Sequence, residues 1–186
     1  TGYTFDGWFD ESGVEVVTGS INDVAADQTL TAQWIGIEYE LTFETGAGSD
    51  IEATTWTFGD ALELPAEPEL AGYEFDGWFT DATTLVALDE SENTVAADQI
   101  LYAKWTAIVY TITFETGENG TVIADGSWTY DAALTLPADP TRTGYTFDGW
   151  FDESNVEVFA GAINDVAADQ TLTAQWIAND YTITFE

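Results

Sequence analysis

Apolar and polar residues alternate along several short stretches of the chain. In 110–116 the apolar Tyr110, Ile112 and Phe114 occupy every second position, with threonine and glutamate between them. Residues 170–177 show the same period of two. Successive side chains of a strand point to opposite faces of a sheet, so this pattern predicts half-buried β-strands. No stretch has a convincing helical period, and the sequence predicts a mainly β fold, α+β at most.

Turn residues separate these stretches. After a polar, glycine-containing segment, Trp128 and Tyr130 alternate with polar residues in a second predicted strand, and Tyr145 begins a third. The Asp148-Gly149 pair before Trp150 is typical of a tight turn or a β-bulge. We therefore expect short strands joined by turns, with one irregularity just before this tryptophan.

The same segments recur at a fixed spacing. Tyr39, Tyr110 and Tyr181 each begin a YxxTFE segment, and both intervals are 71 residues (110 − 39 and 181 − 110). Residues 1–35 and 143–177 are identical at 31 of 35 positions. Such arrays are more often structural or binding devices than enzymes.

The repeat frame predicts four segments. Two are complete repeats, and the flanking ones are the C-terminal part of one repeat and the first strand of another; in chain order they are 1–38, 39–109, 110–180 and 181–186. We therefore expect this chain to be a window from a longer array.

Aromatic residues are expected to form the core of each repeat. A 71-residue unit is close to the lower size limit for an independent core. The chain has no cysteine or histidine for a disulfide or a zinc site, and large aromatic side chains bury much apolar area. The predicted structural core consists of Trp8, Trp34, Trp78, Trp105, Trp150, Trp176, Tyr110, Ile112 and Phe114.

The order of three motifs resembles a known family. YTITFET, then ALTLPADPTRTGYTFDGWF, then ADQTLTAQW are similar to the Listeria–Bacteroides repeat, also called the internalin B-repeat, over essentially the whole chain. The resemblance implies small β-grasp-like (ubiquitin-like) modules, which would here form an elongated array of beads of about 71 residues. It also implies bacterial surface or secreted proteins that serve as spacers, adhesins or weak binders, with no catalytic residues.

The chain departs from that family in its charge. Lys104 and Arg142 are its two cations, and glutamine occupies the positions equivalent to Lys104. With 35 acidic residues the net charge is −33, yet 45% of the residues are hydrophobic, which argues against a disordered acidic tail. Such a surface suits salty extracellular surroundings. Nucleic acid, anionic membranes and direct membrane insertion of this segment are not expected.

Acidic residues gather at two places that could bind calcium, which prefers six to eight oxygen ligands. The first cluster is Asp10, Glu11 and Glu15, repeated as Asp152, Glu153 and Glu157. The second is Asn22, Asp23 and Asp27, repeated as Asn164, Asp165 and Asp169. Neither has the spacing of an EF-hand. Diffuse accumulation of cations is the alternative to ordered calcium sites, and no other cofactor is expected.

Two functional hypotheses remain, and neither is an enzyme. Abundant carboxylates alone do not indicate catalysis, and the chain has no histidine or cysteine. The first hypothesis is the shaft of an extracellular stalk, adhesin or filament. Its partners would be neighbouring repeats and other copies of the chain, associating through strand edges such as 181–186. The second is a multivalent binding module for a carbohydrate or protein ligand, with calcium as a possible requirement.

Overall fold

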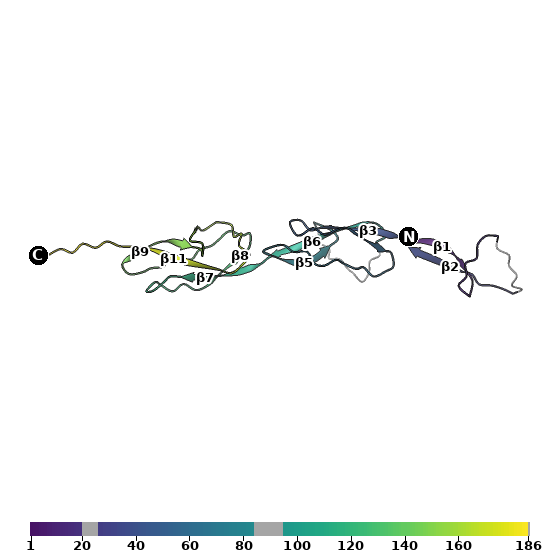
Figure 1. Cartoon of the computed structure of the whole chain (residues 1–186), viewed down its shortest axis with the longest axis horizontal. Helices are drawn as coiled ribbons and strands as arrows, with labels where there is room; N and C mark the ends of the chain where they lie inside the picture. Colours follow the sequence, from purple (N-terminus) through teal and green to yellow (C-terminus); the bar gives the residue numbers. More distant parts are fainter. Residues whose placement is uncertain (20–25, 84–94, 186) are drawn as a thin grey trace. The chain divides into compact units, whose positions relative to one another are not determined.

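The computed structural model describes residues 1–19, 26–83 and 95–185. Within them all regular structure is β, with eleven strands and no helix. Figure 1 shows their course along the chain. The strands are β1 (Tyr3–Phe9), β2 (Thr31–Gly36), β3 (Glu38–Glu44), β4 (Thr54–Thr57), β5 (Tyr73–Phe79), β6 (Gln99–Ala107), β7 (Val109–Glu115), β8 (Gly126–Thr129), β9 (Tyr145–Phe151), β10 (Glu157–Val158) and β11 (Gln170–Ala178). The prediction of a mainly β fold is confirmed.

The chain forms two compact units. Unit 1 contains Thr1–Pro68 and Asp76–Lys104, and unit 2 contains Glu69–Phe75 and Trp105–Glu186. The short segment 69–75, which the repeat frame assigns to the repeat 39–109, thus belongs to unit 2.

A five-stranded sheet makes up most of unit 2. Its order is β10-β9-β11-β7-β8, with the parallel pair β7 and β11 at the centre. Phe114 of β7 lies opposite Leu172 of β11. Antiparallel strands flank this pair on both sides, β8 beside β7 and β9 beside β11. The alternating pattern of the sequence therefore forms a mixed sheet with β8 and β10 at its edges.

The core of unit 2 lies on one face of this sheet. Its buried members are Ile112, Trp128, Leu134, Trp150, Leu172 and Ala174. Leu172 has no exposed surface, and the Trp150 ring contacts Phe114 edge-on at a centroid distance of 5.0 Å. Aromatic pairs of this geometry contribute about 0.5–1.5 kcal/mol beyond the area they bury.

A four-stranded sheet of order β4-β3-β6-β5 repeats this arrangement. Its central strands β3 and β6 are parallel, and Phe43 lies opposite Leu101, at the repeat positions of Phe114 and Leu172. In unit 1 the buried apolar residues are Leu41, Phe43, Trp56, Leu62, Trp78 and Leu101.

The β-bulge predicted at Asp148-Gly149 is present. Along β11, Gln175 lies opposite Gly149 and the next residue lies opposite Phe147, so Asp148 has no partner across the ladder. A bulge of this kind bends the strand and increases its twist locally. The first hairpin has the same irregularity between Phe5 and Gly7.

Two of the predicted core tryptophans are exposed. In the described residues 1–36, β1 and β2 form a two-stranded sheet of their own. Trp8 is 48% exposed and Trp34 is 59% exposed, whereas Trp78 and Trp150 are 6% and 2% exposed. The core role predicted for Trp8 and Trp34 is therefore not seen among the described residues, where β1 and β2 pair with one another in a sheet of two strands.

The remaining predicted core residues are at least partly covered. Ile112 is buried, and four others are half-buried, namely Trp105, Trp176, Tyr110 and Phe114. The Trp176 indole N–H donates a hydrogen bond of 3.1 Å to the Thr116 carbonyl, which ties β11 to the end of β7.

Candidate functional site

Consecutive repeats meet at a junction built on one linking residue. In unit 1 the Ile37 N–H donates to the Gly2 carbonyl at 3.0 Å, and the Ile37 carbonyl accepts from the Phe58 N–H at 2.9 Å. Gly2 belongs to the preceding repeat and Phe58 to the following one. The linking residue is therefore held by the backbone on both sides.

The junction in unit 2 has the same bonds. Ile108 donates to the Gly72 carbonyl and accepts from the Tyr130 N–H, both at 2.9 Å. At the end of the chain Asn179 donates to the Gly144 carbonyl, again at 2.9 Å. We call the two backbone hydrogen bonds of the linking residue the clamp. Its first bond, to the glycine carbonyl of the preceding repeat, recurs at three equivalent positions, Ile37, Ile108 and Asn179.

An aromatic contact completes each of the two full junctions. Tyr3 meets the Phe58 ring at a centroid distance of 5.1 Å, and Tyr73 meets the Tyr130 ring at 5.4 Å, both edge-on. The glycine before each tyrosine lies beneath the same ring, and a Cβ atom at Gly72 would overlap Tyr130. Glycine is required there for space, and also because its φ is +80°.

A polar contact is added in the junction of unit 2. The Tyr73 hydroxyl donates to an Asp131 carboxylate oxygen at 3.1 Å. Desolvation, this hydrogen bond and the charge of Asp131 together raise the pKa of Tyr73 above 10. A raised pKa means that folding favours the neutral phenol. The contribution of this phenol to the free energy of unfolding is therefore complete below pH 10, and it decreases as the pH rises through the higher folded-state pKa.

Two of the predicted calcium residues form turns. Asp10 Oδ1 accepts backbone N–H bonds from Ser12 and Val14, both at 2.9 Å. Asp152 does the same with Ser154 and Val156, at 2.9 and 2.8 Å. Aspartate commonly stabilises a turn in this way.

The structure brings together acids from both predicted clusters. Asp152, Glu153 and Asp169 line a hollow of about 240 Å³. Asp10, Glu11 and Asp27 line a hollow of about 300 Å³ at the equivalent positions.

The other predicted acids and amides lie apart from these hollows. Glu15 and Glu157 lie over Gly7 and Gly149 instead. Asn164 is buried, and its side-chain oxygen accepts from the Val166 N–H and the Gln170 amide. Asp165 is exposed, and Asn22 and Asp23 lie outside the described residues.

A role for Asp169 that sequence reasoning missed is the anchoring of the first strand of its repeat. Its Oδ1 accepts from the Thr111 N–H at 2.7 Å, and Asp98 accepts from the Glu40 N–H at 2.9 Å in the preceding repeat. The Ala-Asp-Gln motif at constant spacing before the last strand was the signal. Over the described part of the chain, no group of three or more acidic, histidine or cysteine side chains is arranged to hold a metal ion.

The two larger sheets pair their central parallel strands in the same register, and the repeats are joined by the same kind of junction. These features define a tandem-repeat protein of β modules. The chain belongs to the family of the Listeria-Bacteroides repeat domain, whose pattern it matches at residues 1–33, 39–104 and 110–175.

Three relatives are similar in sequence to this chain over all or nearly all of its length. A protein of Evansella cellulosilytica that its name assigns to the membrane is 32% identical and covers 100% of this chain. A second protein of that organism, named as a glycine-rich membrane protein, is 34% identical over 100% of the chain. Internalin H of Listeria monocytogenes is 30% identical over 93% of the chain. The chain spans 28%, 22% and 32% of the lengths of these relatives.

In the regions that the structure describes, no helix has the length and apolar character needed to cross a membrane.

Proposed function

We propose that this chain contributes to the shaft of an extracellular, non-enzymatic surface protein, such as a stalk, adhesin or filament. The observation that carries the proposal is the repeated junction. Ile37 and Ile108 are each hydrogen-bonded to the repeat before and the repeat after, and a tyrosine packs on the next repeat at both places. A single clamped linking residue restricts bending far more than a flexible linker does.

The sheet topology supports β-grasp-like modules of about 71 residues. In unit 2 the strands take the order second, first, fifth, third and fourth, with the first and fifth parallel at the centre. The segment between the second and third of these strands contains no helix. We propose a reduced β-grasp-like module in which an extended, proline-containing segment covers the core.

The relatives support a place at the cell surface. Two carry membrane in their names and the third is an internalin. Association between copies through strand edges belongs to the same proposal. With a net charge of −33 on each copy, it requires salt or bound cations to screen the repulsion.

Small-angle X-ray scattering of the whole chain tests the shaft. A compact globule of this length has a radius of gyration of about 16 Å. Clamped beads in a row are expected to give a clearly larger value, with a cross-section that stays constant when salt is added. A radius close to the globular value would contradict the proposal, and a radius that shrinks steadily with salt would indicate flexible beads held apart by charge.

The acidic surface is expected to make stability depend strongly on salt. Raising sodium chloride from 0.01 M to 1 M shortens the Debye length from about 30 to about 3 Å, which screens the repulsion among the 35 acidic residues. We expect the melting temperature to rise by roughly 5 °C or more. Calorimetry across the salt series measures this, and an unchanged melting temperature would contradict it.

The second candidate function is a calcium-dependent multivalent binder. Comparing the stabilisation of the chain by calcium with that by magnesium distinguishes ordered calcium sites from diffuse accumulation of cations. That candidate rests on the recurrence of the acidic hollows, since Asp10, Glu11 and Asp27 in one repeat correspond to Asp152, Glu153 and Asp169 in another. The described side chains are not arranged to hold a metal ion, so calcium would have to draw them together. Calcium and magnesium at equal ionic strength are expected to stabilise equally if the cations are diffuse. A gain specific to calcium that Asp169→Asn removes would instead support the binder.

A further inference from the structure

An apolar hollow lies beside edge strand β8 of unit 2. It has a volume of about 220 Å³. Its lining includes Ser127 and Trp128 of β8, Leu134 and Leu136 of the extended segment, and the buried Leu172 of β11. None of the acidic hollows described above shares these residues.

The hollow runs along the edge of the sheet. Neighbouring residues of a strand point to opposite faces, yet Gly126, Ser127 and Trp128 all line it. β8 is the last strand of the sheet, with β7 as its one neighbour in the sheet order. An edge strand offers backbone N–H and C=O groups to an added strand, and pockets beside it select the side chains of that strand.

The volume fits one bulky apolar side chain. An apolar cavity of about 150 Å³ holds benzene, whereas small-molecule pockets are about 300–1,000 Å³. Gly126 and Phe114 both line the hollow, and a Cβ atom at Gly126 would lie 3.2 Å from the Phe114 ring, closer than ordinary contact. The hollow therefore accommodates a phenylalanine or leucine side chain presented by an extended backbone.

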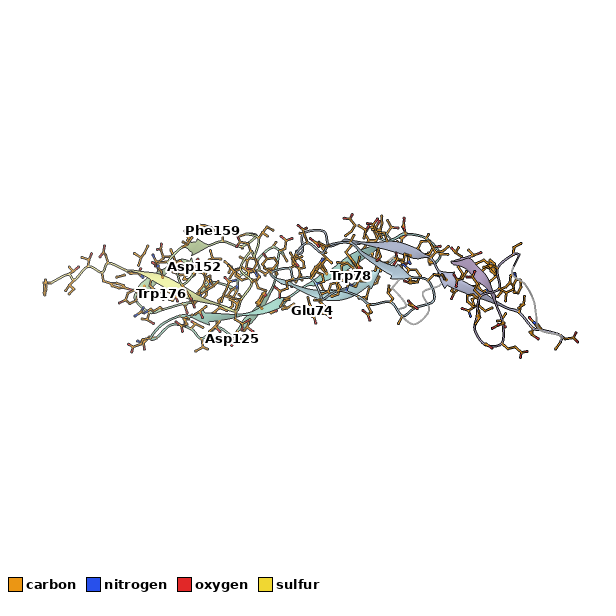
Figure 2. All side chains as sticks on the ribbon, turned by 45° about the vertical axis from the view of Figure 1, so that its right-hand side comes forward. Glu74, Trp78, Asp125, Asp152, Phe159 and Trp176 are labelled. Atoms are coloured by element: carbon orange, nitrogen blue, oxygen red, sulfur yellow. The ribbon has the colours of Figure 1, made fainter. Side chains whose placement is uncertain are left out.

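The charge around β8 selects the partner. Asp125 precedes the strand and Asp131 follows it, and both are exposed. Asp125, next to β8, and Phe159, next to β10, lie at opposite edges of the sheet (Figure 2). A second copy of this chain would bring another 33 negative charges, so at the β8 edge a basic partner is favoured over a second copy.

We propose that the β8 edge binds an extended peptide segment that carries one bulky apolar side chain between lysines or arginines. The backbone of the segment adds to β8 as a strand, its apolar side chain enters the hollow, and its basic residues face Asp125 and Asp131. This inference does not rest on the shaft proposal, since a shaft and a globular binder could each carry such an edge.

The test uses the whole chain and a short labelled peptide with a central phenylalanine, a valine on each side and two lysines at each end. Fluorescence anisotropy gives the affinity, and amide chemical shifts in NMR spectra locate the site. We expect saturable binding, with shifts concentrated at 124–136. Changing the central phenylalanine to alanine or the valines to proline is expected to weaken binding about tenfold or more, which is about 1.4 kcal/mol.

Matched variants of the chain separate the hollow from general attraction. Ala124→Phe fills the hollow from an exposed lining position, while Val122→Phe adds the same ring at a site that is 89% exposed and outside it. Asp125→Lys reverses a charge beside β8, and Asp180→Lys makes the same change elsewhere. We expect Ala124→Phe and Asp125→Lys each to weaken binding at least about tenfold, and the two controls to have little effect.

Three results would overturn the proposal. The first is equal binding of the alanine-centred peptide with shifts spread over all acidic faces, which would mean general electrostatic attraction. The second is equal binding by the Ala124→Phe and Val122→Phe variants. The third is dimerisation of the peptide-free chain through β8, which would identify a second copy as the occupant.

Discussion

Replacing Trp150 with alanine is expected to lower the free energy of unfolding of unit 2 by about 3–5 kcal/mol, the usual loss for a large aromatic side chain in a core. Trp150 is 2% exposed and contacts both Phe114 and Phe147 edge-on. Its removal leaves a cavity between β9 and the central strand pair. The surrounding backbone is held by the sheet and can collapse into that cavity only in part.

The chain supplies a matched control for this change. Trp8 lies in an identical motif, GYTFDGWFDES, but is 48% exposed. Trp8→Ala is expected to lower the stability of unit 1 by less than about 1 kcal/mol, as is usual for surface substitutions. Equal losses from the two substitutions would show that the motif itself, and not burial by the neighbouring strand, determines the role of the tryptophan.

Hydrogen exchange is the suitable measurement, because it resolves the two compact units separately and does not require the chain to unfold in a single two-state transition. The amides of β11 and β7 report on unit 2, and those of β1 and β2 on unit 1. If Trp150→Ala abolishes folding, Trp150→Phe gives a smaller and measurable loss at the same site.

The contrast between Trp150 and Trp8 separates the features that the sequence predicts from those that it does not. Alternation predicted the strands, and the Asp148-Gly149 signal predicted a bulge that the register of β9 and β11 contains. Both features are local, since they depend on residues next to one another in the chain. The local motif did not indicate that Trp8 is exposed here while Trp150 is buried, because burial depends on contacts with strands far away in sequence.

The functional features were harder to predict for a related reason. Asp152 was predicted to be a calcium ligand from its acidic neighbours, but its Oδ1 accepts two backbone N–H groups in a turn. The hollow beside β8 combines residues from four separate segments, and no periodicity in the sequence indicates it. Gly72 of the Gly-Tyr motif is recognisable in the sequence. The Tyr130 ring that lies against it belongs to the next repeat, so the motif alone did not predict the contact.

The junction glycine Gly72 is expected to tolerate a side chain much less well than Gly144. Gly72 and Gly144 occupy the same motif position, belong to the same unit and share a φ of +80°. A Cβ atom at Gly72 would overlap the Tyr130 ring, whereas at Gly144 nothing lies within 4 Å. Alanine at either position has a backbone cost of about 1–2 kcal/mol. Overpacking against Tyr130 adds about 1–3 kcal/mol at Gly72 alone.

We therefore expect Gly72→Ala to destabilise unit 2 clearly more than Gly144→Ala, with the additional loss concentrated at Ile108 and Tyr130, whose amides form the clamp. Hydrogen exchange of these two amides measures it. In the double variant Gly72→Ala with Tyr130→Ala, the overlap is absent, so the two losses should be less than additive. Equal effects of the two glycine substitutions, or strict additivity in the double variant, would show that the ring does not clamp the junction. The tyrosine contact would then be incidental, and restriction of the linking residue would have to come from its backbone hydrogen bonds alone.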